Sequence, residues 1–259
     1  MLEELAGRSP ILLGLDYDGT ISELASRPGL ARPVEGVVPA LKSLARLRTL
    51  IAVAIVSGRP VAELRRMTGL GHEVMFAGVH GLEIAASSDK AGAHNVGDDV
   101  RVVEDAARCA PELDRVREWL AQNVPADAGF EVEDKRLAVA LHYRNARRDA
   151  AIALCARFED FVRTNAPQLR AARNIMVVEA LPVAASKGHA LRVLGQQAGA
   201  AFLPVYFGDD RTDEDAFAEV VSRGVGVLVG EARPSLARWR VESPAAVARA
   251  LIALAASLA

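Results

Sequence analysis

The chain has 259 residues, of which 51% are hydrophobic and 25% charged, and its formal net charge is −2. This composition excludes a disordered chain and is typical of a soluble globular protein with one large domain or two unequal ones. Because the charge is close to neutral, it gives no reason to expect a nucleic acid as partner, and a small molecule is the favoured ligand.

The N-terminus lacks the basic start and apolar stretch of a secretory signal, and no later apolar run is long enough to cross a bilayer. We therefore expect a cytoplasmic protein with no membrane association, and we expect it to be a monomer. Cys109 and Cys155 each fall in an apolar, helical-looking stretch. Buried reduced thiols are favoured over a disulfide or a metal site.

Strand and helix patterns alternate in the first part of the chain, with strands expected at 11–15, 50–56 and 74–77 and helices at 37–47 and 61–67. The polar, glycine-containing stretch 87–99 then resembles a hinge or hairpin. After it the pattern changes to a helix at 104–123, a hairpin at 130–133 and 137–142, a helix at 147–165 and a strand at 175–178.

Alternation resumes with a helix from 187 to 198, a strand at 203–207, a helix at 212–221, a strand at 225–229 and a final helix at 245–258. Such alternation predicts an α/β fold with a Rossmann-like, doubly wound parallel sheet covered on both faces. We expect a catalytic core from 1–100 and 181–259, with 101–180 as an inserted α+β cap that acts as a lid.

Two acidic segments each follow an apolar stretch, one at 16–20 after 11–15 and one at 208–213 after 202–207. Either segment alone is typical of an ordinary turn. Together they would bring at least three carboxylates to one edge of a parallel sheet, where their mutual repulsion requires a cation or a proton. Hard oxygen ligands of this kind suit Mg²⁺.

This site could transfer a phosphoryl group through a covalent intermediate. Asp16, at the strand end, can act as nucleophile, and Asp18 can protonate the leaving oxygen and then activate water. Thr20 could hydrogen-bond the transferring group, although a turn or helix cap explains it equally well.

Two further segments could bind the phosphate. Ser57 and Gly58 follow the strand at 50–56, although a cap before a helix starting at Pro60 is also common. Lys187 opens a helix, where a lysine is unfavourable unless an anion lies close by; a solvated surface lysine is the default alternative.

The expected hairpin at 130–142 carries charged residues on one face. Glu133 and Lys135 are two residues apart, as are His142 and Arg144 on the partner strand. A solvated sheet face is the commoner explanation, but a sugar needs many directional polar contacts.

Four candidate site segments follow one another along the chain, at 16–20, 57–59, 187–188 and 208–213. In this order they resemble the haloacid dehalogenase superfamily of aspartate-nucleophile phosphatases. Three segments (78–83, the hairpin 133–144 and 208–217) resemble the trehalose-6-phosphate phosphatases more narrowly. One departure is Leu181 before Pro182, where this family usually has arginine, and it leaves the role of Glu179 open.

The resemblance implies specific roles for the residues of the site. It makes Asp16 the nucleophile and Asp18 the acid/base, with Mg²⁺ held by Asp16, the Asp18 carbonyl and Asp209. The remaining implied roles are phosphoryl binding (Ser57, Lys187), support of the metal and the lysine (Asp210, Asp213), the substrate entrance (Arg59, His80) and sugar contacts (Glu133, Lys135, Arg144, Glu179).

The implied reaction is hydrolysis of trehalose 6-phosphate. Alternatives within enzymes are a phosphatase for sucrose phosphate or a glycosylglycerol phosphate and, less favoured, a phosphomutase. Outside enzymes, a catalytically silent sugar-phosphate-binding regulator and a phospho-acceptor signalling domain share parts of the pattern, but the first needs no nucleophile and the second leaves the inserted segment unexplained.

Overall fold

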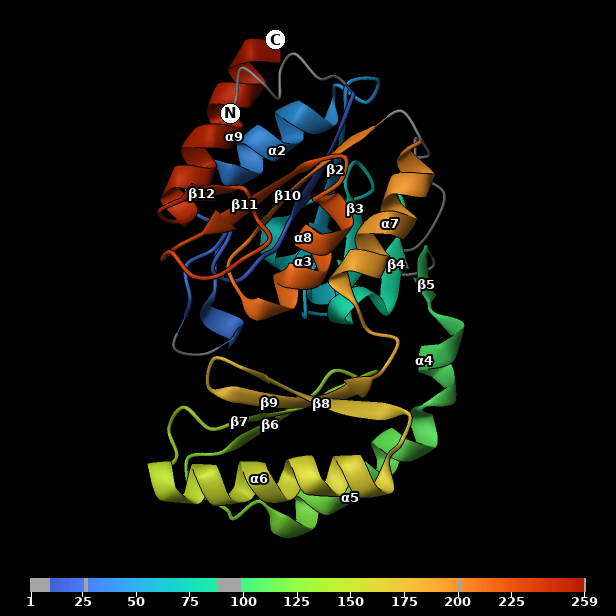
Figure 1. The fold of residues 1–259 in the computed structure, drawn as a ribbon, viewed down its shortest axis with the longest axis vertical. Coiled ribbons are helices and arrows are strands. Elements are labelled where there is room, and N and C mark those ends of the chain that lie inside the picture. Colours follow the sequence, from blue (N-terminus) through green and yellow to red (C-terminus); the bar gives the residue numbers. More distant parts are fainter. Residues whose placement is uncertain (1–9, 26–27, 88–98, 200–201, 259) are drawn as a thin grey trace. The chain divides into compact units, whose positions relative to one another are not determined.

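The computed structural model describes residues 10–25, 28–87, 99–199 and 202–258. The chain forms two compact units (Figure 1), the first Met1–Arg101 with Ser186–Ala259 and the second Val102–Ala185. Each unit has its own core. Within the described residues, no helix combines the length and the apolar character that crossing a membrane requires.

The first unit is built on an eight-stranded sheet of order β12-β11-β10-β1-β2-β3-β4-β5. Its strands are β1 (Ile11–Leu15), β2 (Ile51–Val56), β3 (Met75–Gly78), β4 (Glu83–Ala85), β5 (Val100–Val102), β10 (Leu203–Gly208), β11 (Val225–Val229) and β12 (Trp239–Val241). The pairings from β12 through to β3 are parallel, and β4 runs antiparallel to β3.

The strand that follows β1 in the chain, β2, pairs with one edge of β1, and the later strand β10 pairs with its other edge. The topological switch point therefore lies between β1 and β10. Leu15 pairs with Phe207 there. In open α/β sheets, ligands bind beyond the carboxyl ends of the strands at such a point. The two acidic segments follow these two strands directly.

Helices cover both faces of this sheet, as the alternating pattern predicted (Figure 1). Leu13 and Leu15 pack into a core with α2 (Val37–Ala45), α3 (Val61–Thr68) and α9 (Pro244–Leu258). Leu12 faces the other way, into a core with α7 (Lys187–Ala198) and α8 (Glu214–Val220). Successive strand residues point to opposite faces, which explains why β1 is apolar throughout.

Short 3₁₀ turns complete the first unit: η1 (Pro28–Leu30), η2 (Val79–Gly81) and η3 (Arg211–Asp213). The helix expected at 212–221 therefore begins with a 3₁₀ turn and becomes α-helical at Glu214. Residues 88–98, most of the stretch interpreted as a hinge or hairpin, lie outside the described residues.

The second unit has a four-stranded antiparallel sheet of order β6-β7-β9-β8. Its strands are β6 (Glu131–Asp134), β7 (Val139–His142), β8 (Leu169–Asn174) and β9 (Val177–Pro182). Residues of α5 (Ala110–Asn123) and α6 (Arg148–Asn165) pack with those of the sheet in one apolar core. Cys109 and Cys155 are buried there as free thiols.

Two sequence predictions in this unit are wrong. The single helix at 104–123 is two, α4 (Glu104–Arg108) and α5, because Pro111 has no N–H to donate to the carbonyl of Ala107 and its ring would clash with it. The strand at 175–178 begins too early, since Ile175 and Met176 form the turn of a β8–β9 hairpin, with Met176 at φ 59°.

Candidate active site

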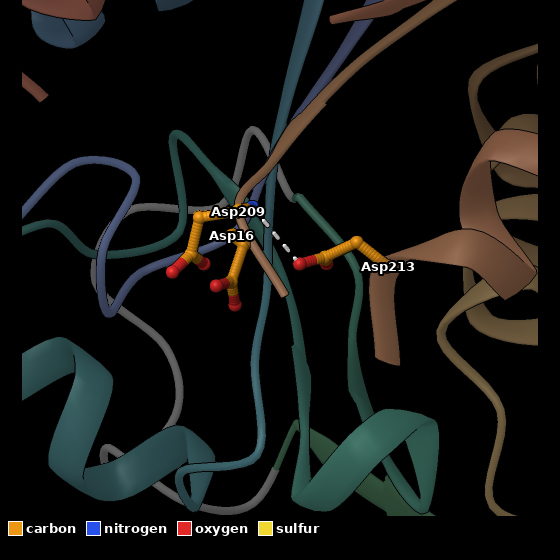
Figure 2. Close-up of side chains that lie close together, drawn as sticks. All are labelled: Asp16, Asp209 and Asp213. Atoms are coloured by element: carbon orange, nitrogen blue, oxygen red, sulfur yellow. Dashed lines mark hydrogen bonds between the residues drawn. The ribbon is translucent and has the colours of Figure 1, made fainter. Parts of the chain in front are cut away.

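Three carboxylates meet at the switch point of the first unit. Asp16 follows β1 and Asp209 follows β10, and the backbone N–H of Asp16 donates to the carbonyl of Phe207 at 2.9 Å. One oxygen from each of Asp16, Asp209 and Asp213 lies within 4.8 Å of the others. Figure 2 shows Asp16 and Asp209 side by side, with the carboxyl group of Asp213 facing them.

Asp213 is completely buried, and both of its carboxylate oxygens accept hydrogen bonds. Its Oδ1 accepts from Lys187 Nζ at 2.8 Å and from the Tyr206 hydroxyl at 2.6 Å. Its Oδ2 accepts from the backbone N–H groups of Asp209 (3.1 Å) and Asp210 (3.0 Å). With both oxygens engaged twice, Asp213 suits a supporting role better than a ligand role.

Lys187, the first residue of α7, lies between two of these acids. Its Nζ is 2.9 Å from Asp16 Oδ1 and 2.8 Å from Asp213 Oδ1, and the residue is 3% exposed. Burial lowers the pKa of the ammonium, but Asp16 and Asp213 outweigh it and raise that pKa above its ordinary value. The lysine therefore stays charged.

One lysine does not balance three carboxylates. Burial, followed by repulsion from Asp213, raises the pKa of Asp209 to about 7, and burial also raises the pKa of Asp16 well above 3.8 despite the attraction of Lys187. The negative charge that Lys187 leaves unbalanced thus disfavours the ionised forms of Asp16 and Asp209 unless a further cation is present.

The site fits a divalent cation. Asp209 Oδ1 is buried and has no hydrogen-bond partner among the described residues. Gly19, at φ 77°, leaves room beside this carboxylate, because a Cβ there would overlap it. Asp16 and Asp209 together offer the carboxylate oxygens that hard cations prefer as ligands.

Asp18 meets Arg59 at the edge of this centre. Its carboxylate is 34% exposed, and both of its oxygens accept from the guanidinium, from Nε and from Nη2, at 2.7 Å each. Ser57 is buried, and its Oγ accepts from the backbone N–H of Arg59 at 3.3 Å. Thr20 is fully buried, and its Oγ1 has no partner within the described part of the chain.

The turn at 78–83 packs against the Ser57 loop. The N–H of His80 donates to the carbonyl of Ser57 at 2.9 Å, and a Cβ on Gly58 would lie 2.6 Å from His80 Nε2, so the imidazole rests on this glycine. Glu83 ends the 78–83 segment but is not among the predicted site residues. It is buried and accepts from the N–H of Val61 at 2.9 Å. Its acidic character inside an apolar stretch was the available signal.

In the second unit, four predicted residues form a polar network. Glu133 Oε2 lies 2.8 Å from His142 Nε2, and Lys135 Nζ lies 2.9 Å from Glu179 Oε1. Burial raises the pKa of Glu133, but the hydrogen bond from His142 and the charge of Lys135 outweigh it and lower that pKa. Arg144 lies in the exposed turn after β7.

Comparison with known proteins decides the family. The family model described as trehalose-phosphatase matches residues 14–245. The chain belongs to the trehalose-phosphatase family. A trehalose-phosphate phosphatase of Mycobacterium marinum is 36% identical over 94% of the chain and 61% of the relative. A protein of Mycobacterium tuberculosis H37Rv named an uncharacterized glycosyl hydrolase is 38% identical over 98% of the chain and 19% of the relative. The chain thus spans from a fifth to three fifths of the length of these relatives.

Solved structures share the fold of this chain. The C-terminal domain of a Candida albicans trehalose-6-phosphate phosphatase has a TM-score of 0.80 at 21% identity, covering 98% of this chain and 95% of that one. A haloacid dehalogenase-like hydrolase from Bacteroides thetaiotaomicron has a TM-score of 0.59 at 16% identity, covering 93% and 98%. The predicted fold class is confirmed.

Proposed function

We propose that this chain hydrolyses trehalose 6-phosphate to trehalose and phosphate, with Mg²⁺, through an aspartyl-phosphate on Asp16. The observation that carries the proposal is Asp16 itself. It lies at the carboxyl end of β1, is 2.9 Å from Lys187, and belongs to a chain of the trehalose-phosphatase family. The name of the Mycobacterium marinum relative supports the substrate.

In the first step Asp16 attacks phosphorus, the bond from phosphorus to the sugar oxygen breaks, and Asp18 gives its proton to that oxygen. In the second step a water molecule gives a proton to Asp18 and attacks phosphorus, which breaks the bond to Asp16 and releases phosphate. Lys187 offsets the charge of the phosphoryl oxygens throughout.

The phosphoryl oxygens need donors besides Lys187. Ser57 Oγ, Thr20 Oγ1 and the backbone N–H of Gly58 are the groups we assign to them. The buried Thr20 hydroxyl, which lacks a partner among the described residues, supports this assignment, because buried polar groups are normally hydrogen-bonded.

Mg²⁺ would be held by Asp16, the backbone carbonyl of Asp18 and Asp209, with Asp210 and Asp213 supporting the ion and Lys187. When bound, the ion supplies positive charge that polarises the phosphoryl group. Two observations support such a site: the Oδ1 of Asp209 has no partner in the part of the chain that the structure describes, and the pKa of this acid is raised.

The sugar contacts are assigned to Glu133, Lys135 and Glu179 of the polar network in the second unit. A further contact is assigned to Arg144, which lies in the exposed turn after β7. Glu179 is 2% exposed and paired with Lys135. Buried polar groups that bind hydroxyls discriminate strongly against ligands that leave them unpaired. The cytoplasmic location and the monomeric state stay predictions.

The test is phosphate release from trehalose 6-phosphate, with Mg²⁺ and with EDTA, beside sucrose 6-phosphate and glucose 6-phosphate at equal concentrations. Strong Mg²⁺-dependent preference for trehalose 6-phosphate is expected. Equal release from all three would retain the phosphatase and reject the substrate, and no release from any of them would favour a sugar-phosphate-binding regulator.

A further inference from the structure

Asp18, the proposed acid/base residue, accepts two hydrogen bonds from the side chain of Arg59. Arg59 donates from Nε to Asp18 Oδ2 and from Nη2 to Asp18 Oδ1, both at 2.7 Å. A guanidinium matches a carboxylate in this forked geometry and fixes the plane of the acid as well as its distance. Asp18, by contrast, is a short side chain on a loop and is one third exposed.

Arg59 is itself held from several sides. Its Nη1 donates to Glu63 at 2.7 Å, and its guanidinium carbon lies 5.4 Å from the centre of the buried Tyr17 ring. All three guanidinium nitrogens therefore donate to a carboxylate. The residue is 6% exposed, so these contacts lie largely away from water, where they are stronger.

The backbone of Arg59 is also fixed. Its N–H donates to Ser57 Oγ at 3.3 Å, and its carbonyl accepts from the N–H of Val79 at 2.9 Å. Val79 and the next residue, His80, both have positive φ, 48° and 53°. A β-branched residue in this region is strained, and such strain persists only where surrounding contacts impose it.

We propose that Arg59 is a positioning residue for proton transfer: it aims Asp18 at the leaving oxygen, and this role, rather than contact with sugar, determines its effect on the rate. When Asp18 carries the proton, one carboxyl oxygen stays on Arg59 while the other donates to the sugar oxygen as the phosphorus–oxygen bond breaks. The inference rests on the proposed function.

The test varies the leaving group. kcat/KM is measured for Arg59→Met and Arg59→Lys with trehalose 6-phosphate, phenyl phosphate and 4-nitrophenyl phosphate, with Arg192→Met as control. Arg192 forms only a surface pair with Glu219 in the described structure and is 55% exposed. Because kcat/KM reports events up to the first irreversible step, the later hydrolysis of the aspartyl-phosphate does not enter.

For Arg59→Met we expect a loss of about 100-fold with trehalose 6-phosphate, a smaller loss with phenyl phosphate and little change with 4-nitrophenyl phosphate, whose leaving group needs no proton. Arg59→Lys should keep part of the activity with the same order of losses. Equal losses on both aryl phosphates, or a loss confined to the sugar phosphate, would overturn the proposal.

A second variant distinguishes a positioning role of Arg59 from a loss of folding. Glu63→Gln removes a charged anchor of Arg59 without touching Asp18, and it should give the same graded pattern with smaller losses. A uniform loss accompanied by a lower melting temperature would indicate a structural role for Arg59 and contradict the proposal. Failure of the wild-type chain on all three substrates would instead reject the proposed function itself.

Discussion

Replacing Asp209 with asparagine should stabilise the metal-free protein while abolishing its response to Mg²⁺. Asp209 is mostly buried, faces Asp213 and has one oxygen without a partner among the described residues. Asparagine has nearly the same shape but no charge, so it removes the repulsion and leaves the hydrogen bond from the Asp209 N–H to Asp213 in place.

The magnitude and the pH window follow from the pKa. In the folded, metal-free chain the pKa of Asp209 is about 7, against an ordinary value of 3.8. Between pH 3.8 and 7 the folded state keeps a proton on Asp209 that the unfolded chain has released. The stability that this carboxyl group contributes in its protonated form is therefore full below pH 3.8 and is lost as pH rises through 7. At about 1.4 kcal/mol per pKa unit, the wild type loses up to about 4 kcal/mol by pH 8.

The assay is urea unfolding in EDTA at pH 5 and pH 8. We expect Asp209→Asn to raise the free energy of unfolding at pH 8 by up to about 4 kcal/mol and to have a smaller effect at pH 5. Mg²⁺ should then stabilise the wild type and not the variant, because only the wild type retains the proposed ligand set.

The matched control is Asp215→Asn. Asp215 is an exposed aspartate in the first turn of α8, where its charge favours the helix, so this change should lower stability by about 0.5 kcal/mol. An Asp209→Asn variant that is less stable than wild type at pH 8 in EDTA, or one that Mg²⁺ stabilises equally, would refute the reasoning.

Two further substitutions test the framework of the site. Lys187→Met leaves Asp16 and Asp213 buried without their cation, so urea unfolding at neutral pH should show a loss of about 3–5 kcal/mol; an unchanged midpoint would contradict the buried pairing. Gly208→Ala places a Cβ on the carboxyl group of Asp213, so turnover should fall at least tenfold while the circular dichroism spectrum stays folded; full activity would show that Asp213 can move freely.

The elements that position the site could be predicted because their signals are local. The apolar run of β1 ends at Asp16 and that of β10 ends just before Asp209, and parallel strands bring such ends to one edge. The helix that begins at Lys187 follows a serine, whose Oγ caps it by accepting from the N–H of His189.

Other features depend on tertiary contacts that a single sequence does not encode locally. Arg59 and Asp18 are 41 positions apart, and only the folded loop joins them. The pattern of the stretch 202–207 predicts an apolar strand that includes Tyr206, and the hydrogen bond of its hydroxyl to Asp213 depends on the path of η3. β8 was missed because its sequence, with Arg170 and Arg173, lacks a clear apolar alternation.

In the second unit, Pro111 interrupts a periodic pattern that predicts a single helix. The pattern from Glu104 to Asn123 fits one helix, but Pro111 ends hydrogen bonding to the preceding turn and produces two. The apolar stretch at 175–178 predicts a strand, yet Ile175 is 54% exposed in a hairpin turn. Neither Ile175 nor Met176 is a typical turn residue, so the pairing of β8 with β9, rather than a local turn signal, places the turn there.

The most direct test of the covalent mechanism is the turnover of Asp16→Asn with trehalose 6-phosphate and Mg²⁺, measured beside wild type and Asp215→Asn. Removal of the nucleophile predicts a loss of about 10³-fold or more in kcat, while Asp215→Asn stays close to wild type. If Asp16→Asn formed the same products at a rate near that of the wild type, Asp16 would not be the nucleophile and the account would be wrong.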